Sequence, residues 1–176
     1  MKTLISRVIW QWAGVCMLLS LAGCSPGTPK FLAGDLNGVN HTSAAINHFS
    51  VNGYGGANIS PYGYGGGVCC VMLPSQWSPG LKFKVEWETD PNSTARLPRL
   101  GTDEYRAGYA KHKAKYQQHS AIVDIPSYEI GTLCSLKIHF LPCNQVKATT
   151  ACMAYGQPGY PIKDPIEMKE PAVCPK

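Results

Sequence analysis

Apolar and polar residues alternate along several short stretches of the chain, a pattern typical of β-strands. The clearest alternation covers residues 81–88, where the apolar positions on one face are Leu81, Phe83, Val85 and Trp87. Weaker strand patterns cover residues 41–51, 68–73, 120–125, 133–141 and 145–153. Pro-Cys-Asn at positions 142–144 separates the last two and favours a hairpin. Short strands broken by Gly and Pro predict an all-β, β-sandwich-like fold.

One stretch has a helical pattern instead. Gly-Thr-Asp-Glu at positions 101–104 predicts the start of a helix that runs to about Gln118, with acidic residues in its first turn and lysines near its end. The residues on one face of this helix are Tyr105, Tyr109, His112 and Tyr116. We expect this face to pack on the sheet, because an aromatic stripe on a helix usually belongs to a core. A contact stripe for a partner is the alternative.

The N-terminus has the layout of a secretory signal. Lys2 and Arg7 precede an apolar run over residues 8–22, which is too short and too close to the start to predict a membrane span. The run ends in Leu-Ala-Gly-Cys at positions 21–24, which resembles the bacterial lipobox. This motif predicts that Cys24 carries the lipid and becomes the mature N-terminus. Ser25 after it favours the outer membrane, with the protein facing the periplasm.

These signals divide the chain into three parts. We expect residues 1–23 to be a lipoprotein signal peptide and residues 24–37 to be a short tether. Residues 38–176 are then a single β-rich domain with a Pro/Gly-rich C-terminal tail. The acyl chains would hold this domain at the membrane permanently.

Export to an oxidising compartment decides how the remaining cysteines are interpreted. They are Cys69, Cys70, Cys134, Cys143, Cys152 and Cys174. An even number favours up to three disulfides, and six cysteines permit fifteen connectivities among which the sequence does not choose. Because neighbouring residues of a strand point to opposite faces, we expect Cys69 and Cys70 to have two different partners.

A zinc site is the alternative use of these cysteines. His41, His48 and His139 would then join the thiolates as ligands. However, no C-x₂-C pair is present, and the spacings match no standard ligand pattern. We therefore expect no metal and no other cofactor.

The stretch at residues 52–67 is rich in glycine and contains Gly-Tyr-Gly-Gly twice. It lacks the third glycine of a dinucleotide-binding motif and the Gly-Lys-Ser/Thr of a P-loop. We expect a loop with positive φ angles that presents Tyr54, Tyr62 and Tyr64 to a partner, since tyrosine and glycine are favoured at adaptable binding surfaces. A long connection between strands with no binding role is the alternative.

Charge and motifs exclude several functions. Without Lys2 and Arg7 the chain has fourteen basic and eleven acidic residues, a net charge of +3. This excess is too small and too scattered to predict nucleic-acid binding. The sequence contains no Gly-x-Ser-x-Gly, His-Glu-x-x-His or Ser-x-x-Lys motif, so we expect no enzymatic activity.

Several short motifs resemble a family of proteobacterial lipoproteins known as domain of unknown function 3304. They are Gly-Val-Asn-His-Thr at positions 38–42, Val-Cys-Cys-Val at 68–71, Trp-Ser-Pro-Gly-Leu at 77–81, Val-Asp-Ile-Pro at 123–126 and Ile-His-Phe-Leu-Pro at 138–142. The resemblance covers residues 39–164. Residues 90–118 depart from the family pattern and are interpreted as an insertion.

The resemblance implies a function. Genes of this family often lie beside genes for type VI secretion lipase effectors, and such lipoproteins are regarded as immunity proteins. We therefore expect a protein that binds and neutralises a periplasmic toxin of the phospholipase type. The alternative is an envelope structural or assembly lipoprotein without a toxin partner.

Overall fold

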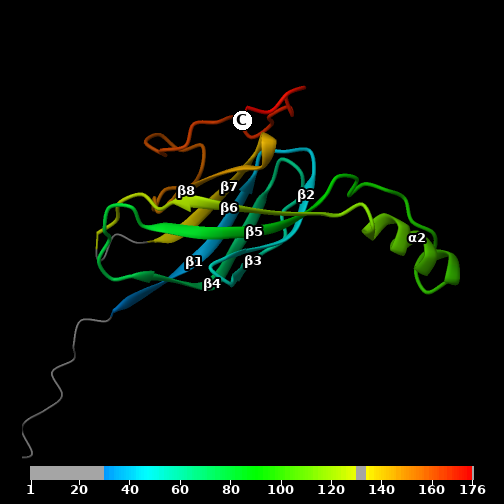
Figure 1. Ribbon diagram of the computed structural model, residues 1–176, viewed down its shortest axis with the longest axis horizontal. Helices are drawn as coiled ribbons and strands as arrows, with labels where there is room; N and C mark the ends of the chain where they lie inside the picture. The colour runs from blue at the N-terminus through cyan, green and yellow to red at the C-terminus, as the bar shows by residue number, and fades with distance from the viewer. Residues whose placement is uncertain (1–29, 130–133, 176) are drawn as a thin grey trace, which may run out of the picture.

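Two four-stranded β-sheets pack face to face in the computed structural model, which describes residues 30–129 and 134–175 (Figure 1). The strands are β1 (Phe31–Asn40), β2 (Ala45–Val51), β3 (Tyr54–Gly56), β4 (Tyr64–Pro74), β5 (Lys82–Asp90), β6 (Gln117–Asp124), β7 (Ser135–Leu141) and β8 (Gln145–Thr149). Within the described residues there is one α-helix, α2 (Asp103–Lys113), and one 3₁₀ turn, η1 (Pro142–Asn144). The predicted all-β sandwich with one short helix is confirmed.

The first sheet has the strand order β4-β1-β7-β8, and the second has the order β3-β2-β5-β6. β1 and β7 are parallel, whereas every other neighbouring pair is antiparallel. β3 and β4, the edge strands of the two sheets, lie next to each other on one side of the sandwich. β6 and β8 meet in the same way on the other side.

The core lies between the sheets and is built from alternate residues of their strands. The predicted alternation of β5 is confirmed, since Phe83, Val85 and Trp87 are buried in this core. Phe140 of β7 lies in its centre, with its ring 5.2 Å from that of Phe49 and 5.5 Å from that of Trp87. The other buried members are Leu36, Ile46, Val51, Ile59, Val71, Leu73, Val123, Ile125, Leu136 and Ile138.

The prediction of a tether up to residue 37 is wrong from Phe31 onward, where β1 begins. β1 is an inner strand with β4 on one side and β7 on the other, and its Leu36 is fully buried in the core. Gly34, Asp35 and Asn37 make the sequence look like a linker, but pairing on both sides satisfies its backbone. The predicted signal peptide, Cys24 and the first part of the tether lie outside the described residues.

The prediction of one long loop over residues 52–67 is wrong at both of its ends. β3 begins at Tyr54 and β4 begins at Tyr64, so the connection between strands is short. Glycine allows this close pairing, because a Cβ at Gly56 would lie 2.0 Å from the Phe49 ring. Positive φ angles occur at Gly53 (85°) and Tyr62 (50°), in the turns on either side of β3.

The helix begins where the sequence predicts, but it ends earlier and does not pack on a sheet. The Thr102 side chain accepts a hydrogen bond from the Tyr105 N–H at 3.1 Å and caps the first turn. α2 ends at Lys113, because the chain must already pair with β5 from Gln117. None of its residues is buried, so the expected packing of its aromatic face on the sheet is wrong.

Candidate functional site

The tyrosines predicted to meet a partner lie along the side of the sandwich where β3 and β4 are neighbours. Tyr54 is 40% exposed and Tyr64 is 60% exposed, whereas Tyr62 in the intervening turn is half-buried. We call these three residues the tyrosine edge. Two of its rings are thus available on strands that backbone pairing holds in place, since Tyr54 pairs with Val51 and Tyr64 pairs with Val39. Their role in binding stays a prediction.

The tyrosine edge connects to the C-terminal segment, which has no strand or helix in its described part, residues 150–175. Figure 1 shows this segment in orange and red beside β7 and β8. The Tyr64 ring lies 5.8 Å from that of Tyr155 in this segment. The Tyr155 ring in turn contacts that of Tyr160 at 5.5 Å.

Beneath these rings lies a fully buried chain of hydrogen bonds that sequence analysis missed. His41 Nε2 lies 2.8 Å from His139 Nδ1, and His139 Nε2 lies 2.6 Å from the Tyr160 hydroxyl. At the other end, His41 Nδ1 lies 2.7 Å from the carbonyl oxygen of Pro165. The side chains come from the residue that follows β1, from β7 and from the C-terminal segment, and all three are 0% exposed.

The carbonyl at one end sets the direction of every proton in this chain. Because a carbonyl oxygen only accepts, His41 donates from Nδ1 and its Nε2 is left as an acceptor when the ring is neutral. His139 then donates from Nδ1 to His41, and the Tyr160 hydroxyl donates to His139 Nε2. Each polar atom of the two rings is satisfied with both histidines neutral.

The surroundings favour the neutral forms of His139 and Tyr160. Burial, followed by repulsion from His41, lowers the pKa of His139 to about 3. Burial, followed by the neighbouring Tyr155, raises the pKa of Tyr160 above its usual value. Since no substrate reaches fully buried rings, the arrangement acts as a clasp that fixes the C-terminal segment against the first sheet.

The clasp had a weak sequence signal. His41 and His139 were both zinc candidates, and His139 lies between the apolar residues Ile138 and Phe140. Tyr160 and Pro165 come from an irregular Pro/Gly-rich stretch with no pattern that points to them. The structure pairs the two histidines with each other, and it places His48 on β2 at 3.7 Å from Glu88. The three histidines therefore do not converge on the thiolates as the zinc alternative requires.

The six cysteines lie in three pairs at disulfide distance: Cys69 with Cys70, Cys134 with Cys152, and Cys143 with Cys174. The prediction that Cys69 and Cys70 have different partners is wrong. It assumed the alternation of side chains along a regular strand, but β4 is irregular here: Gly34 pairs with Val71 and Leu36 with Val68, so the register shifts at the two cysteines.

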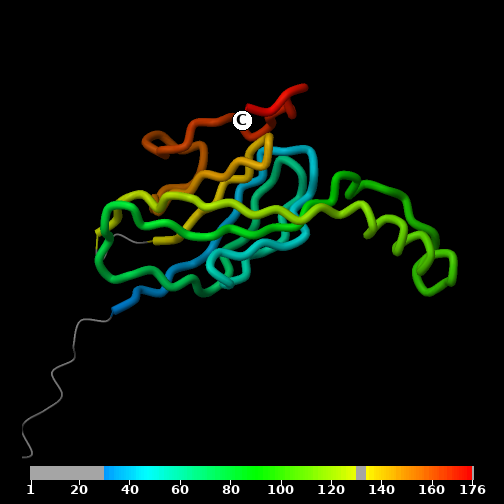
Figure 2. Tube along the Cα trace, in the orientation of Figure 1, coloured from blue at the N-terminus to red at the C-terminus, as the bar shows by residue number. Residues whose placement is uncertain are grey.

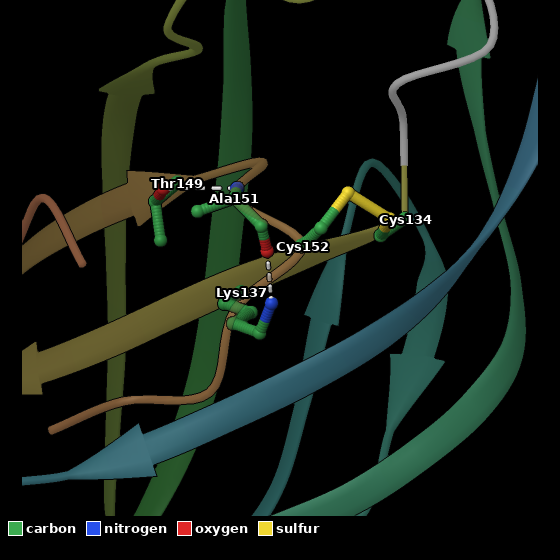
Figure 3. The surroundings of a disulfide bond; sticks show 5 residues. All are labelled: Cys134, Lys137, Thr149, Ala151 and Cys152. Atoms are coloured by element: carbon green, nitrogen blue, oxygen red, sulfur yellow. Dashed lines mark hydrogen bonds between the residues drawn. A yellow bond between two sulfur atoms is a disulfide. The ribbon is translucent and has the colours of Figure 1, made fainter. Parts of the chain in front are cut away.

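The Cys134 and Cys152 pair ties the start of β7 to the chain after β8 (Figure 3). Beside it the Lys137 ammonium donates to the carbonyl of Ala151, and the Ala151 N–H donates to the Thr149 hydroxyl at 3.2 Å. Burial lowers the pKa of Lys137. These contacts hold the beginning of the C-terminal segment on the same sheet as the clasp.

A cleft of about 280 Å³ opens at one end of the sandwich, between the two sheets. Its lining includes His119, whose ring stacks on Trp87 at 5.2 Å and whose Nε2 lies 3.0 Å from the Thr89 hydroxyl. Burial lowers the pKa of His119. Pro91 and Gln117 also line the cleft, so it lies where the connection between β5 and β6 leaves the sandwich.

That connection, residues 91–116, projects from the sandwich as an arm that contains α2 (Figure 1). Figure 2 shows its path away from the sheets and back. The arm packs on itself, since a Cβ at Gly108 in the helix would lie 3.2 Å from Pro98 in the outgoing limb. At its base, His112 Nε2 lies 2.8 Å from the Asp90 carboxylate.

Within residues 30–129 and 134–175, no helix has the length and apolar character needed to cross a membrane. No curated protein and no solved structure matches the chain. A family profile does match, over residues 39–148, and its description is protein of unknown function (DUF3304). The match spans more than half of the 176 residues and extends from the end of β1 to the end of β8. The chain therefore belongs to the DUF3304 family.

Proposed function

We propose that this protein is a lipid-anchored immunity protein that faces the periplasm and neutralises a phospholipase-type effector of type VI secretion. The lipobox at positions 21–24 supports the anchor, and Ser25 supports placement at the outer membrane. The family resemblance supports the immunity role.

The tyrosine edge is the observation that carries the binding role. Tight protein complexes depend on a few large anchors, among which tyrosine is enriched, surrounded by well-packed contacts. Tyr54 and Tyr64 are exposed on strands whose backbones pair with β2 and β1, so their positions are set before a partner arrives. When a rigid scaffold already holds the binding residues in place, they lose little conformational entropy as the complex forms.

The proposed mechanism is occlusion of the effector at the membrane. A phospholipase must reach the lipid surface to act, and a protein tethered there has a high effective concentration at the same surface. Binding across the tyrosine edge would cover the face of the effector that approaches the lipid. No catalytic residue of this chain is required.

Replacing Tyr54, Tyr62 and Tyr64 together by Ala is expected to weaken binding of the neighbouring lipase effector by more than about 2 kcal/mol, or roughly 30-fold. The measurement is titration calorimetry with the purified effector, with thermal melting as a check of the fold. Ile122→Ala combined with Val173→Ala is the matched control, because these residues are 63% and 83% exposed elsewhere on the surface. Unchanged affinity in a folded triple variant would rule out the tyrosine edge as the contact.

Replacing Cys24 by Ser is expected to abolish lipidation, because the thiol is the atom to which the diacylglyceryl group is attached. Radiolabelled palmitate should enter the wild-type protein only, and the variant should leave the membrane fraction. A variant at Cys16, which lies inside the predicted signal, serves as the control and should be labelled normally. Label that persists in Cys24→Ser would contradict the lipobox assignment.

A further inference from the structure

The arm gathers most of the positive charge of the chain. Between residues 91 and 116 there are six basic and two acidic residues, a net charge of +4. The rest of the chain after Cys24 has eight basic and nine acidic residues, a net charge of −1. The six basic residues of the arm are all exposed: Arg96, Arg99, Arg106, Lys111, Lys113 and Lys115. The charge that appears scattered in sequence is therefore concentrated on one projection.

All three arginines that follow the predicted signal lie on this arm. Arg106 forms an ion pair with Asp103 one turn away in α2. Within the described residues, the side chains of Arg96 and Arg99 have no hydrogen bond or ion pair, so their guanidinium groups are available. A guanidinium group binds a carboxylate through two parallel hydrogen bonds, which makes arginine well suited to acidic protein surfaces.

The other exposed groups of the arm are those of a protein interface. The Tyr109 ring is 39% exposed and stacks on the half-buried Tyr105 ring at 6.0 Å, and Leu100 at the turn is 75% exposed. Aromatic residues and arginine are enriched where proteins meet. In contrast, α2 contains no Leu, Ile, Val, Phe or Trp, so it has no apolar face to insert into a bilayer.

The position of the arm also disfavours a lipid surface. β1 enters at one end of the long axis of the molecule, and the arm projects from the other end (Figures 1 and 2). Seven residues, 24–30, separate the predicted lipid attachment from β1, and they span at most about 25 Å when fully extended. The arm is therefore directed away from the anchored end of the chain.

We propose that the arm is a second docking surface, which binds an acidic surface of the effector through Arg96 and Arg99. This inference rests on the proposed function, because the effector is the partner to which it commits. The arm and the cleft at its base would engage a protrusion of the partner, while the tyrosine edge supplies the anchors. The positive field of the arm would also accelerate the encounter.

The test compares two double variants with the same change in net charge. Arg96→Glu with Arg99→Glu reverses charge on the arm, and Lys163→Glu with Lys169→Glu reverses charge at exposed positions of the C-terminal segment. Association with the purified, catalytically inactive effector is measured by surface plasmon resonance at 50 and 300 mM NaCl. Binding to vesicles of phosphatidylethanolamine and phosphatidylglycerol (7:3) is measured in parallel, and sedimentation gives the oligomeric state.

The expected result is at least a tenfold loss of affinity in the arm variant at low salt, a smaller loss at high salt, and less than a twofold change in the control. Wild-type affinity in the arm variant would overturn the arm as a docking surface and leave the immunity function intact. Absence of effector binding by the wild-type protein would overturn both. If the arm variant keeps its effector affinity but loses vesicle binding, the arm binds lipid instead. If it keeps its effector affinity but loses dimer formation, the arm serves self-association. Either result would also overturn the inference.

Discussion

Replacing Cys143 and Cys174 together by Ala is expected to lower the free energy of unfolding by about 2–4 kcal/mol. The bond links residues 31 positions apart, so it restricts a long loop of the unfolded chain. It also joins the turn between β7 and β8 to the end of the C-terminal segment, where the Cys143 N–H donates to the Glu170 carboxylate at 2.6 Å. Its loss should loosen the segment that the histidine clasp holds.

Guanidinium unfolding followed by tryptophan fluorescence measures this change, and the melting temperature should fall by on the order of 10 °C. The matched control is Cys69→Ala with Cys70→Ala, because that pair has a sequence separation of 1 and closes no loop. We expect a loss of less than about 1 kcal/mol for the control. Equal stability of the Cys143 and Cys174 variant and the wild-type protein would contradict the assigned pairing.

The second large effect is acid destabilisation through His139. The folded protein keeps His139 neutral, with a pKa of about 3, whereas the unfolded chain takes up the proton near its usual pKa of 6.5. Below pH 6.5 the unfolded state therefore binds more protons. As the pH drops from 6.5 toward 3, His139 should lower the free energy of unfolding by about 1.4 kcal/mol per pH unit. Above pH 6.5 the contribution of His139 should be constant.

His139→Gln separates this effect from that of other acid-sensitive groups. A glutamine can accept from the Tyr160 hydroxyl and donate toward His41, and it takes up no proton. Unfolding measured between pH 4 and pH 8 should show a shallower pH dependence in this variant than in the wild-type protein. The control is His48→Gln, because the side chain of His48 is 63% exposed. Identical slopes for His139→Gln and wild type would contradict a neutral buried His139.

Local patterns predicted the strands whose two faces differ most. β5 alternates because one of its faces is in the core and the other in water, and the Thr102 cap is a local motif that needs no tertiary contact. β1 was missed because its pairing with two neighbours outweighs the poor strand propensity of Gly34 and Asp35. The orientation of α2 was missed because helical periodicity does not reveal whether a surface is available to cover it.

The candidate site was predictable only where its residues lie close together in the sequence. Tyrosine and glycine in the 52–67 stretch pointed to exposed rings, and two of the three rings are exposed. The histidine clasp joins positions 98 and 21 residues apart, and its last partner lies in a segment without periodicity. No short-range pattern encodes such contacts, because they depend on where the C-terminal segment crosses the first sheet.

The central place of β1 has a consequence for the order in which the two sheets fold. β1 is among the first parts of the described chain to be synthesised, yet its Asp35 pairs with Ser135, a hundred residues later in the sequence. Contacts this distant in sequence form slowly, because a long loop must close before they contribute any stability. The second sheet draws its strands from residues 45–124, so it can assemble before β7 becomes available. β1 can pair with β4 on one side, but its other side stays unpaired until β7 arrives to complete the first sheet.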